Sequence, residues 1–118
     1  MKGISETAFS TQVEDLFDRF GWKWMHIKPS IMQSGRWASS MNEGGKGWLD
    51  YIALRPPRVV VAELKDASTK MTPEQEEWFR LWGECGIEVY LWRPKHIEEI
   101  AEILQVTIKE VRNARQDS

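Results

Sequence analysis

Two apolar runs on either side of a Pro-Pro pair constrain the fold of this chain more than any other feature. Residues 49–55 and 59–65 each have the length of a single strand, and prolines occupy positions 56 and 57 between them. The second run begins Val-Val-Val-Ala, and β-branched side chains fit the pleated, packed surface of a sheet. The prolines preset a turn and cannot take part in a central ladder. The sequence therefore predicts a β-hairpin over residues 49–65.

The segments around the hairpin predict a mixed α/β arrangement. Apolar residues recur at helical spacing near the N-terminus, after residue 72 and again after residue 96. Residues 22–28 and 87–92 are short runs typical of strands, and the glycine- and serine-rich segment 29–47 predicts a long irregular loop. The expected order is α-β-β-β-α-β-α in one domain over residues 1–118, with a core over about 5–94 and a C-terminal helical extension over 95–118.

The two long helices have recognisable ends. Ser5 fits the N-cap of the first helix, which is expected over residues 5–20, and Gly21 fits its end. Thr72, followed by a proline and then by Gln75, predicts a capping box at the start of the second helix. The apolar face of that second helix is expected to consist of Trp78, Phe79, Trp82 and Cys85.

Composition excludes several classes of protein. Because Cys85 is the single cysteine, no intrachain disulfide or cysteine zinc site is expected, and we predict a small buried thiol on a helix. No apolar run approaches the length that spans a bilayer, and the polar start of the chain is unlike a secretory signal. We therefore expect a cytoplasmic protein that has no membrane partner.

The distribution of charge favours one candidate nucleic-acid surface. The net charge of −2 argues mildly against a nucleic-acid partner, but between residues 21 and 47 four basic residues stand against one acidic residue. Within this stretch Lys28, Arg36 and Lys46 are candidate contacts to a DNA backbone. The alternative is a merely solvated loop.

The hairpin places two carboxylates together. In a symmetric turn the numbers of opposed residues sum to 113, so Asp50 lies across from Glu63, at a Cβ separation of about 4.5–5.5 Å. Lys65 projects from the same face because strand side chains alternate. The carboxylates repel each other unless a cation compensates, and Mg²⁺ accepts carboxylates and a backbone carbonyl such as that of Leu64. The alternative is a charged cluster on an exposed sheet face.

Two further polar residues lie on apolar helical stripes. Glu6 precedes Val13 by seven residues, close to two helical turns, so it is expected on the buried face of the first helix. The alternative is that Glu6 interacts with the helix dipole. Gln75 leads the stripe of the second helix, and its alternative role is to complete the capping box.

The order of these residues resembles a known family. Asp50, a gap of 12 residues and then Glu63-Leu64-Lys65 resemble the PD-(D/E)xK nuclease motif. The helix that starts at Ser5-Glu6 and the later Thr72-Pro73-Glu74-Gln75 with Trp78 resemble the VRR-NUC branch, especially short phage-encoded members related to Holliday junction resolvases. The likeness covers about residues 5–94. One departure is visible, because Leu49 stands where the family has a proline before the aspartate.

The resemblance implies an α/β, restriction-endonuclease-like core with a central mixed β-sheet flanked by helices. It implies that Asp50, Glu63 and the Leu64 carbonyl bind Mg²⁺ or Mn²⁺, and that Lys65 assists the attacking water. Glu6 would contribute a direct or outer-sphere contact, and Gln75 would complete the site.

The expected function is hydrolysis of phosphodiester bonds in DNA by an endonuclease that selects branched or junction structures. The resemblance also implies a homodimer in a bacterial or phage-infected cell, with no nucleotide cofactor. The alternative is a catalytically silent nuclease fold that binds DNA or a protein partner.

Overall fold

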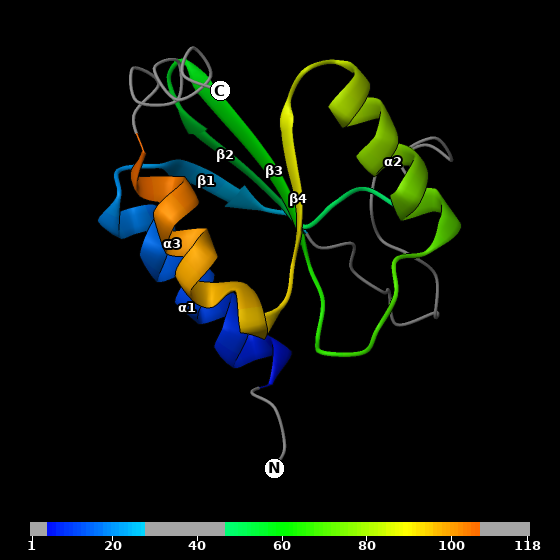
Figure 1. Cartoon of the computed structure of the whole chain (residues 1–118). Coiled ribbons are helices and arrows are strands. Elements are labelled where there is room, and N and C mark those ends of the chain that lie inside the picture. The colour runs from blue at the N-terminus through cyan, green and yellow to red at the C-terminus, as the bar shows by residue number, and fades with distance from the viewer. Residues whose placement is uncertain (1–4, 28–46, 107–118) are drawn as a thin grey trace, which may run out of the picture.

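The computed structural model describes residues 5–27 and 47–106 of the chain. The order of elements confirms the predicted α-β-β-β-α-β-α, with a short 3₁₀ turn before the last helix (Figure 1). The elements are α1 (Glu6–Arg19), β1 (Lys23–His26), β2 (Tyr51–Arg55), β3 (Arg58–Leu64), α2 (Pro73–Glu84), β4 (Glu88–Trp92), η2 (Pro94–His96) and α3 (Ile97–Gln105).

The four strands form one mixed sheet in the order β1-β2-β3-β4. β1 and β3 each pair with β2 in antiparallel orientation, whereas β3 and β4 are parallel and are joined by a crossover through α2. The hairpin register runs from Tyr51 opposite Ala62 to Arg55 opposite Arg58. Each of these pairs sums to 113, which confirms the predicted symmetric turn.

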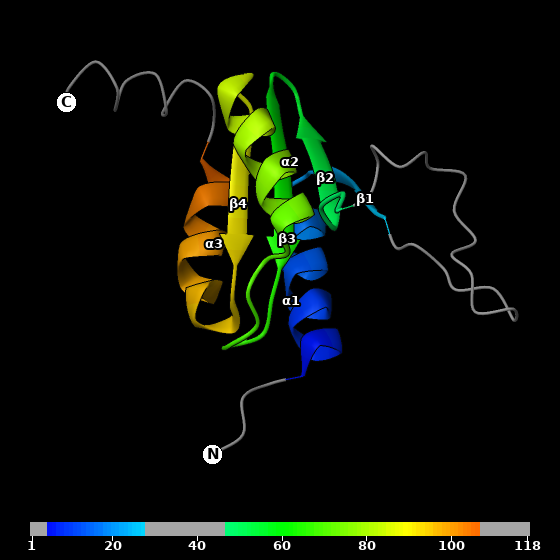
Figure 2. The ribbon, with the colours of Figure 1, turned by 90° about the vertical axis from the view of Figure 1, so that its right-hand side faces the viewer.

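Helices cover the two faces of the sheet unequally. α1 and α3 lie side by side on one face, and α2 lies on the other (Figures 1 and 2). The main core forms on the α1/α3 side, because the apolar stripe of α1 and alternate residues of the strands point there. Its fully buried side chains include Phe9, Val13, Phe17, Val60, Ala62, Ile100 and Leu104.

The α2 side of the sheet is more open, and one expectation about it is wrong. The expected face of Trp78, Phe79, Trp82 and Cys85 is only half-buried at its aromatic positions, and Cys85 is exposed. Cys85 is the C-cap that follows the last helical residue, so it has left the packed stripe. The Trp48 ring packs against the aromatic residues of this face, with its centroid 4.7 Å from that of Trp78 and 5.6 Å from that of Trp82.

Hydrogen bonds hold the end of α3 beside the hairpin turn. The buried Arg58 guanidinium donates to the carboxylate of Glu88 and to the carbonyls of Ile103 and Val106. Because a buried guanidinium needs partners for its donors, these bonds lock the end of α3 onto β3. Within residues 5–27 and 47–106, no helix is long and apolar enough to cross a membrane.

Candidate functional site

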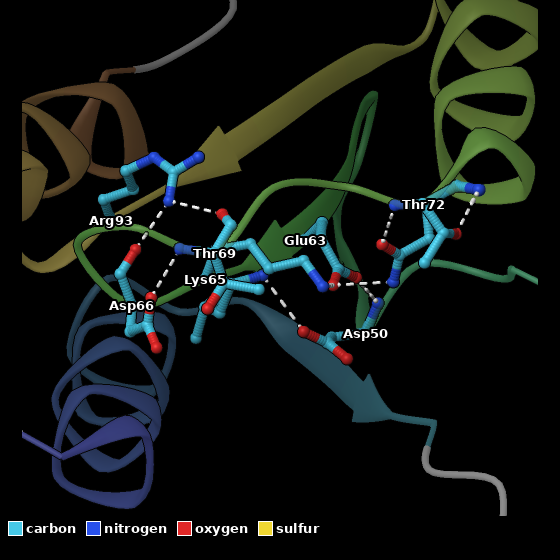
Figure 3. A network of polar contacts seen from close by, with 9 residues as sticks. Asp50, Glu63, Lys65, Asp66, Thr69, Thr72 and Arg93 are labelled. Carbon is cyan, nitrogen blue, oxygen red and sulfur yellow. Dashed lines mark hydrogen bonds and ion pairs between the residues drawn. The ribbon is translucent and has the colours of Figure 1, made fainter.

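Asp50 and Glu63 meet at the open end of the hairpin, as the register predicts. The Asp50 amide donates to Glu63 Oε1 at 3.1 Å, and the Leu64 amide donates to Asp50 Oδ2 at 3.0 Å (Figure 3). A third bond, from the Ile27 amide to the Asp50 carbonyl at 2.7 Å, ties this corner to the end of β1. Backbone bonds from three segments therefore fix the carboxylate pair.

Lys65, the residue directly after the end of β3, joins the pair. Its Nζ lies 3.2 Å from Glu63 Oε2, and its side chain is 15% exposed, whereas that of Glu63 is 3% exposed. Charge pairs this well sheltered from water interact more strongly than pairs on the surface. The surface-cluster interpretation therefore does not describe Glu63, which is buried.

Gln75 caps α2 and also contacts Glu63. Its Oε1 accepts from the Thr72 amide at 3.0 Å, and the Thr72 hydroxyl accepts from the Gln75 amide at 3.1 Å, which completes a capping box. Its Nε2 donates to Glu63 Oε2 at 2.9 Å. A single amide thus caps α2 and fixes the orientation of the buried carboxylate.

Gly47 makes the approach of α2 to the carboxylate pair possible. Its φ is +86°, and a Cβ placed there would lie 2.5 Å from Glu74 Cβ and 2.8 Å from the Gln75 nitrogen. Glycine is therefore required both by the left-handed backbone and by the close contact with the first turn of α2. The segment that leads into Asp50 consequently lies in close contact with Gln75, the residue that donates to Glu63.

The environment of Glu63 disfavours its charged form. Burial and, to a lesser extent, repulsion by Asp50 raise the pKa of this carboxyl to about 7, although Lys65 acts to lower it. Two carboxylates this close repel each other in a site with little water. A cation between them would relieve the repulsion.

The residues at this corner fit a hard divalent cation. The Leu64 amide points toward Asp50, and the carbonyl of a strand residue projects to the same side of the strand as its amide. Asp50, Glu63 and the Leu64 carbonyl therefore offer oxygen ligands around one gap. No group of three His, Cys, Asp or Glu side chains is placed to hold a metal within residues 5–27 and 47–106. A metal here would complete its shell with water, as Mg²⁺ usually does.

The other expected site residues are not described to the level of their side chains. Glu6 is the first residue of α1, and the burial of Phe9, Val13 and Phe17 confirms the apolar stripe on which it was expected. The side chain of Glu6, and the whole of Lys28, Arg36 and Lys46, lie outside the described parts of the chain. Their roles stay predictions.

Two contributors to this region were not expected from the sequence. Arg93 donates from Nη1 to the carbonyls of Asp66 and Thr69, and Asp66 in turn accepts from the amides of Ser68 and Thr69. The pattern Asp-Ala-Ser-Thr at 66–69 is typical of an Asx turn and could have been recognised. No local sequence pattern identifies Arg93, because its hydrogen-bond partners lie 27 and 24 residues earlier in the chain.

Comparisons of the chain with models of protein families, with curated proteins and with solved structures give no match. Function is therefore inferred from the residues of this site and from the motif that they form.

Proposed function

We propose that this protein is a divalent-metal-dependent deoxyribonuclease with a restriction-endonuclease-like core of the VRR-NUC type. One observation supports the proposal most directly. The buried Glu63 accepts from the Asp50 amide on one oxygen and lies beside the Lys65 ammonium on the other, just beyond the pair of Tyr51 and Ala62 that ends the β2–β3 ladder. This set resembles the PD-(D/E)xK motif in residue type and order, with Leu49 in place of the proline.

The carboxylates and one backbone carbonyl would hold Mg²⁺ or Mn²⁺. Asp50, Glu63 and the Leu64 carbonyl are the oxygen donors at this corner. When bound, the metal supplies a more acidic water and stabilises charge that develops on a phosphoryl oxygen. Gln75 holds Glu63 through Oε2, so the carboxylate would not need to reorient when the metal arrives.

Lys65 is suited to act on the water or on the phosphate. Its ammonium lies beside Glu63, with three donors on a flexible stem, and the side chain is partly open to solvent. From this position Nζ would orient the attacking water by hydrogen bonding or donate to a non-bridging oxygen of the scissile phosphate. Either role requires the ammonium but not a particular DNA sequence.

The proposal is tested by cleavage of labelled four-way junction, flap, duplex and single-stranded DNA with Mg²⁺, Mn²⁺ or EDTA. We expect metal-dependent products with the wild-type chain, and a loss of at least about 10³-fold in Lys65→Ala and in the double variant Asp50→Ala/Glu63→Ala. Lys70→Ala is the matched control, because Lys70 is an exposed lysine five residues along the chain. Unchanged cleavage by the double variant would refute the nuclease.

The same experiment separates catalysis from binding alone. If wild-type protein retains DNA in a filter-binding assay but releases no product with either metal, a silent DNA-binding module replaces the nuclease proposal. Charge reversal of Arg36 and Lys46, with Lys95→Glu as control, tests the proposed DNA contacts outside the described ranges. The proposed homodimer is tested by light scattering at several protein concentrations, because a dimer dissociates on dilution.

A further inference from the structure

The segment 66–72 connects two residues that converge on one oxygen atom. Lys65 precedes it and Gln75 follows shortly after it, and both contact Glu63 Oε2, at 3.2 and 2.9 Å. The first contact comes from the residue directly after β3, which Figure 3 labels, and the second comes from the first turn of α2. The connecting segment therefore joins the two residues that contact this oxygen.

β4 fixes the beginning of this segment. The Lys65 amide donates to the Trp92 carbonyl at 3.0 Å, one step beyond the last ladder pair of β3 and β4. Arg93 directly follows Trp92, the last residue of β4, and its amide donates to His96 Nδ1 at 3.0 Å. The backbone of Arg93 is consequently held on both sides, by the sheet and by η2.

The Arg93 side chain then holds the segment itself. Its Nη1 donates to the Asp66 carbonyl at 2.6 Å and to the Thr69 carbonyl at 2.8 Å. Between these carbonyls the Asp66 carboxylate accepts from the amides of Ser68 at 2.9 Å and Thr69 at 2.7 Å, which closes a tight turn. Hydrogen bonds from Thr69 and Ser68 lower the pKa of Asp66 to about 2, so this acceptor stays ionised at neutral pH.

We propose that Arg93 is a positioning residue that holds the segment 66–72 so that Lys65 and Gln75 meet at Glu63. The catalytic consequence rests on the proposed nuclease function, but the positioning itself does not. In this role Arg93 acts through the segment whose carbonyls it binds. A guanidinium suits this role because its planar shape fixes the directions of the two N–H groups of Nη1, one for each carbonyl. The donors of a lysine ammonium rotate on a flexible stem and are not fixed in this way.

A simple anchor for a surface turn is the competing explanation. In that case, removing Arg93 would lower the free energy of unfolding and leave the contacts of Glu63 unchanged. The positioning role predicts something different, namely that the Gln75 side-chain amide changes its environment even where the fold is intact.

The experiment compares Arg93→Met and Arg93→Lys with the control Lys95→Met, which removes an exposed cation two residues away. Arg93→Met keeps an apolar stem and removes the donors. The first readout is the ¹H–¹⁵N spectrum of the metal-free protein, with the Gln75 side-chain amide as reporter and the sheet amides as a check on folding. The second is the separation of kcat from KM on the cleaved DNA.

We expect the Gln75 side-chain resonance to move in Arg93→Met while the amides of β2 and β3 stay in place. We expect kcat to fall about 10- to 100-fold with KM within about threefold, because small misplacements of catalytic groups have effects of this size. Arg93→Lys should lie between Arg93→Met and the wild type, and it serves in place of Arg93→Met if that variant does not fold.

The outcomes distinguish this proposal from the nuclease proposal. If the Gln75 resonance moves in Arg93→Met but the wild-type protein cleaves no DNA, the positioning role is supported and the nuclease proposal is refuted. A Gln75 resonance and a kcat that stay at wild-type values in both variants overturn the positioning role and leave the nuclease standing.

Discussion

Gln75 donates from Nε2 to Oε2 of Glu63 at 2.9 Å, while its own Oε1 closes the capping box with the Thr72 amide. The first helical turn of α2 and the buried carboxylate therefore share one side chain. A glutamate can also complete a capping box at this position, but a glutamate would place a third carboxylate beside Glu63. The capping box and the site together select glutamine.

Gln75→Glu is expected to keep the cap and damage the site. The new carboxylate still accepts from the Thr72 amide, but it cannot donate to Glu63 and repels it. We expect the free energy of unfolding of the metal-free protein at pH 8 to fall by about 1–2 kcal/mol. DNA cleavage should fall at least about tenfold. Denaturation in EDTA and a cleavage assay measure the two effects.

Thr72→Ala is the matched control, because it removes the hydroxyl that accepts from the Gln75 amide and leaves the Gln75 side chain in place. Loss of this cap should cost about 1 kcal/mol with little change in cleavage. If Thr72→Ala and Gln75→Glu impair cleavage equally, the contact of Gln75 with Glu63 has no separate role.

The sequence was sufficient for the carboxylate pair because the relation is local. The hairpin turn and the two-residue period of a strand determine which residues face each other, so Asp50 and Glu63 could be paired by counting. The helices could be placed in the same way, since their caps and apolar stripes are local signals. Element order and register both agree with the structure.

The remaining features depend on long-range packing and could not be derived from local patterns. Whether Gln75 reaches Glu63 depends on how the crossover through α2 returns to β4, and the sequence left its two roles open. The same crossover brings Arg93 to Asp66, 27 residues earlier. The expected burial of Cys85 was wrong because periodicity does not show where a helix stops covering its sheet.

Gly47→Ala is expected to disrupt the site through backbone geometry alone. A methyl group there would lie 2.6 Å from the Glu74 carbonyl carbon, at a φ of +86°. The left-handed backbone costs about 1–2 kcal/mol for alanine, and the clash adds about 1–3 kcal/mol unless α2 moves away. We therefore expect lower stability in chemical denaturation and a weaker contact of Gln75 with Glu63, with reduced cleavage.

Gly21→Ala separates the two causes. Gly21 has a φ of +79°, but nothing lies within 4 Å of a Cβ built there. This variant should lose only the backbone contribution of about 1–2 kcal/mol and retain its cleavage activity. Equal losses of stability in the two alanine variants would show that the close contact at Gly47 has no effect.

The stability of the metal-free protein is expected to fall as pH rises through the titration of Glu63. Its folded pKa is raised to about 7 from 4.5, chiefly by burial. Well below pH 4.5 the Glu63 carboxyl is neutral in both the folded and the unfolded chain. As the pH rises above 4.5, this carboxyl ionises in the unfolded chain before it ionises in the folded chain, which favours unfolding. The contribution to stability is lost progressively up to pH 7 and amounts to at most about 3 kcal/mol.

Glu63→Gln should remove this dependence on pH, so that the variant's stability curve is flatter between pH 4.5 and 7.5 than that of the wild type in EDTA. Glu77→Gln is the control, because Glu77 is an exposed glutamate on α2. Denaturant unfolding at each pH gives the curves. Parallel curves for Glu63→Gln and the wild type would show that Glu63 titrates normally in the folded state.

Metal affinity should depend on pH in the opposite direction, because Mg²⁺ binds the ionised form of Glu63. With a pKa of about 7 in the metal-free protein, binding below that pH must release a proton. The apparent affinity should then fall about 25-fold from pH 7.5 to pH 5.5. Calorimetry in two buffers with different ionisation heats measures both the affinity and the released proton. An affinity that stays constant over this range, with no proton released, would mean that Glu63 is not a ligand and that the metal, if bound, lies elsewhere.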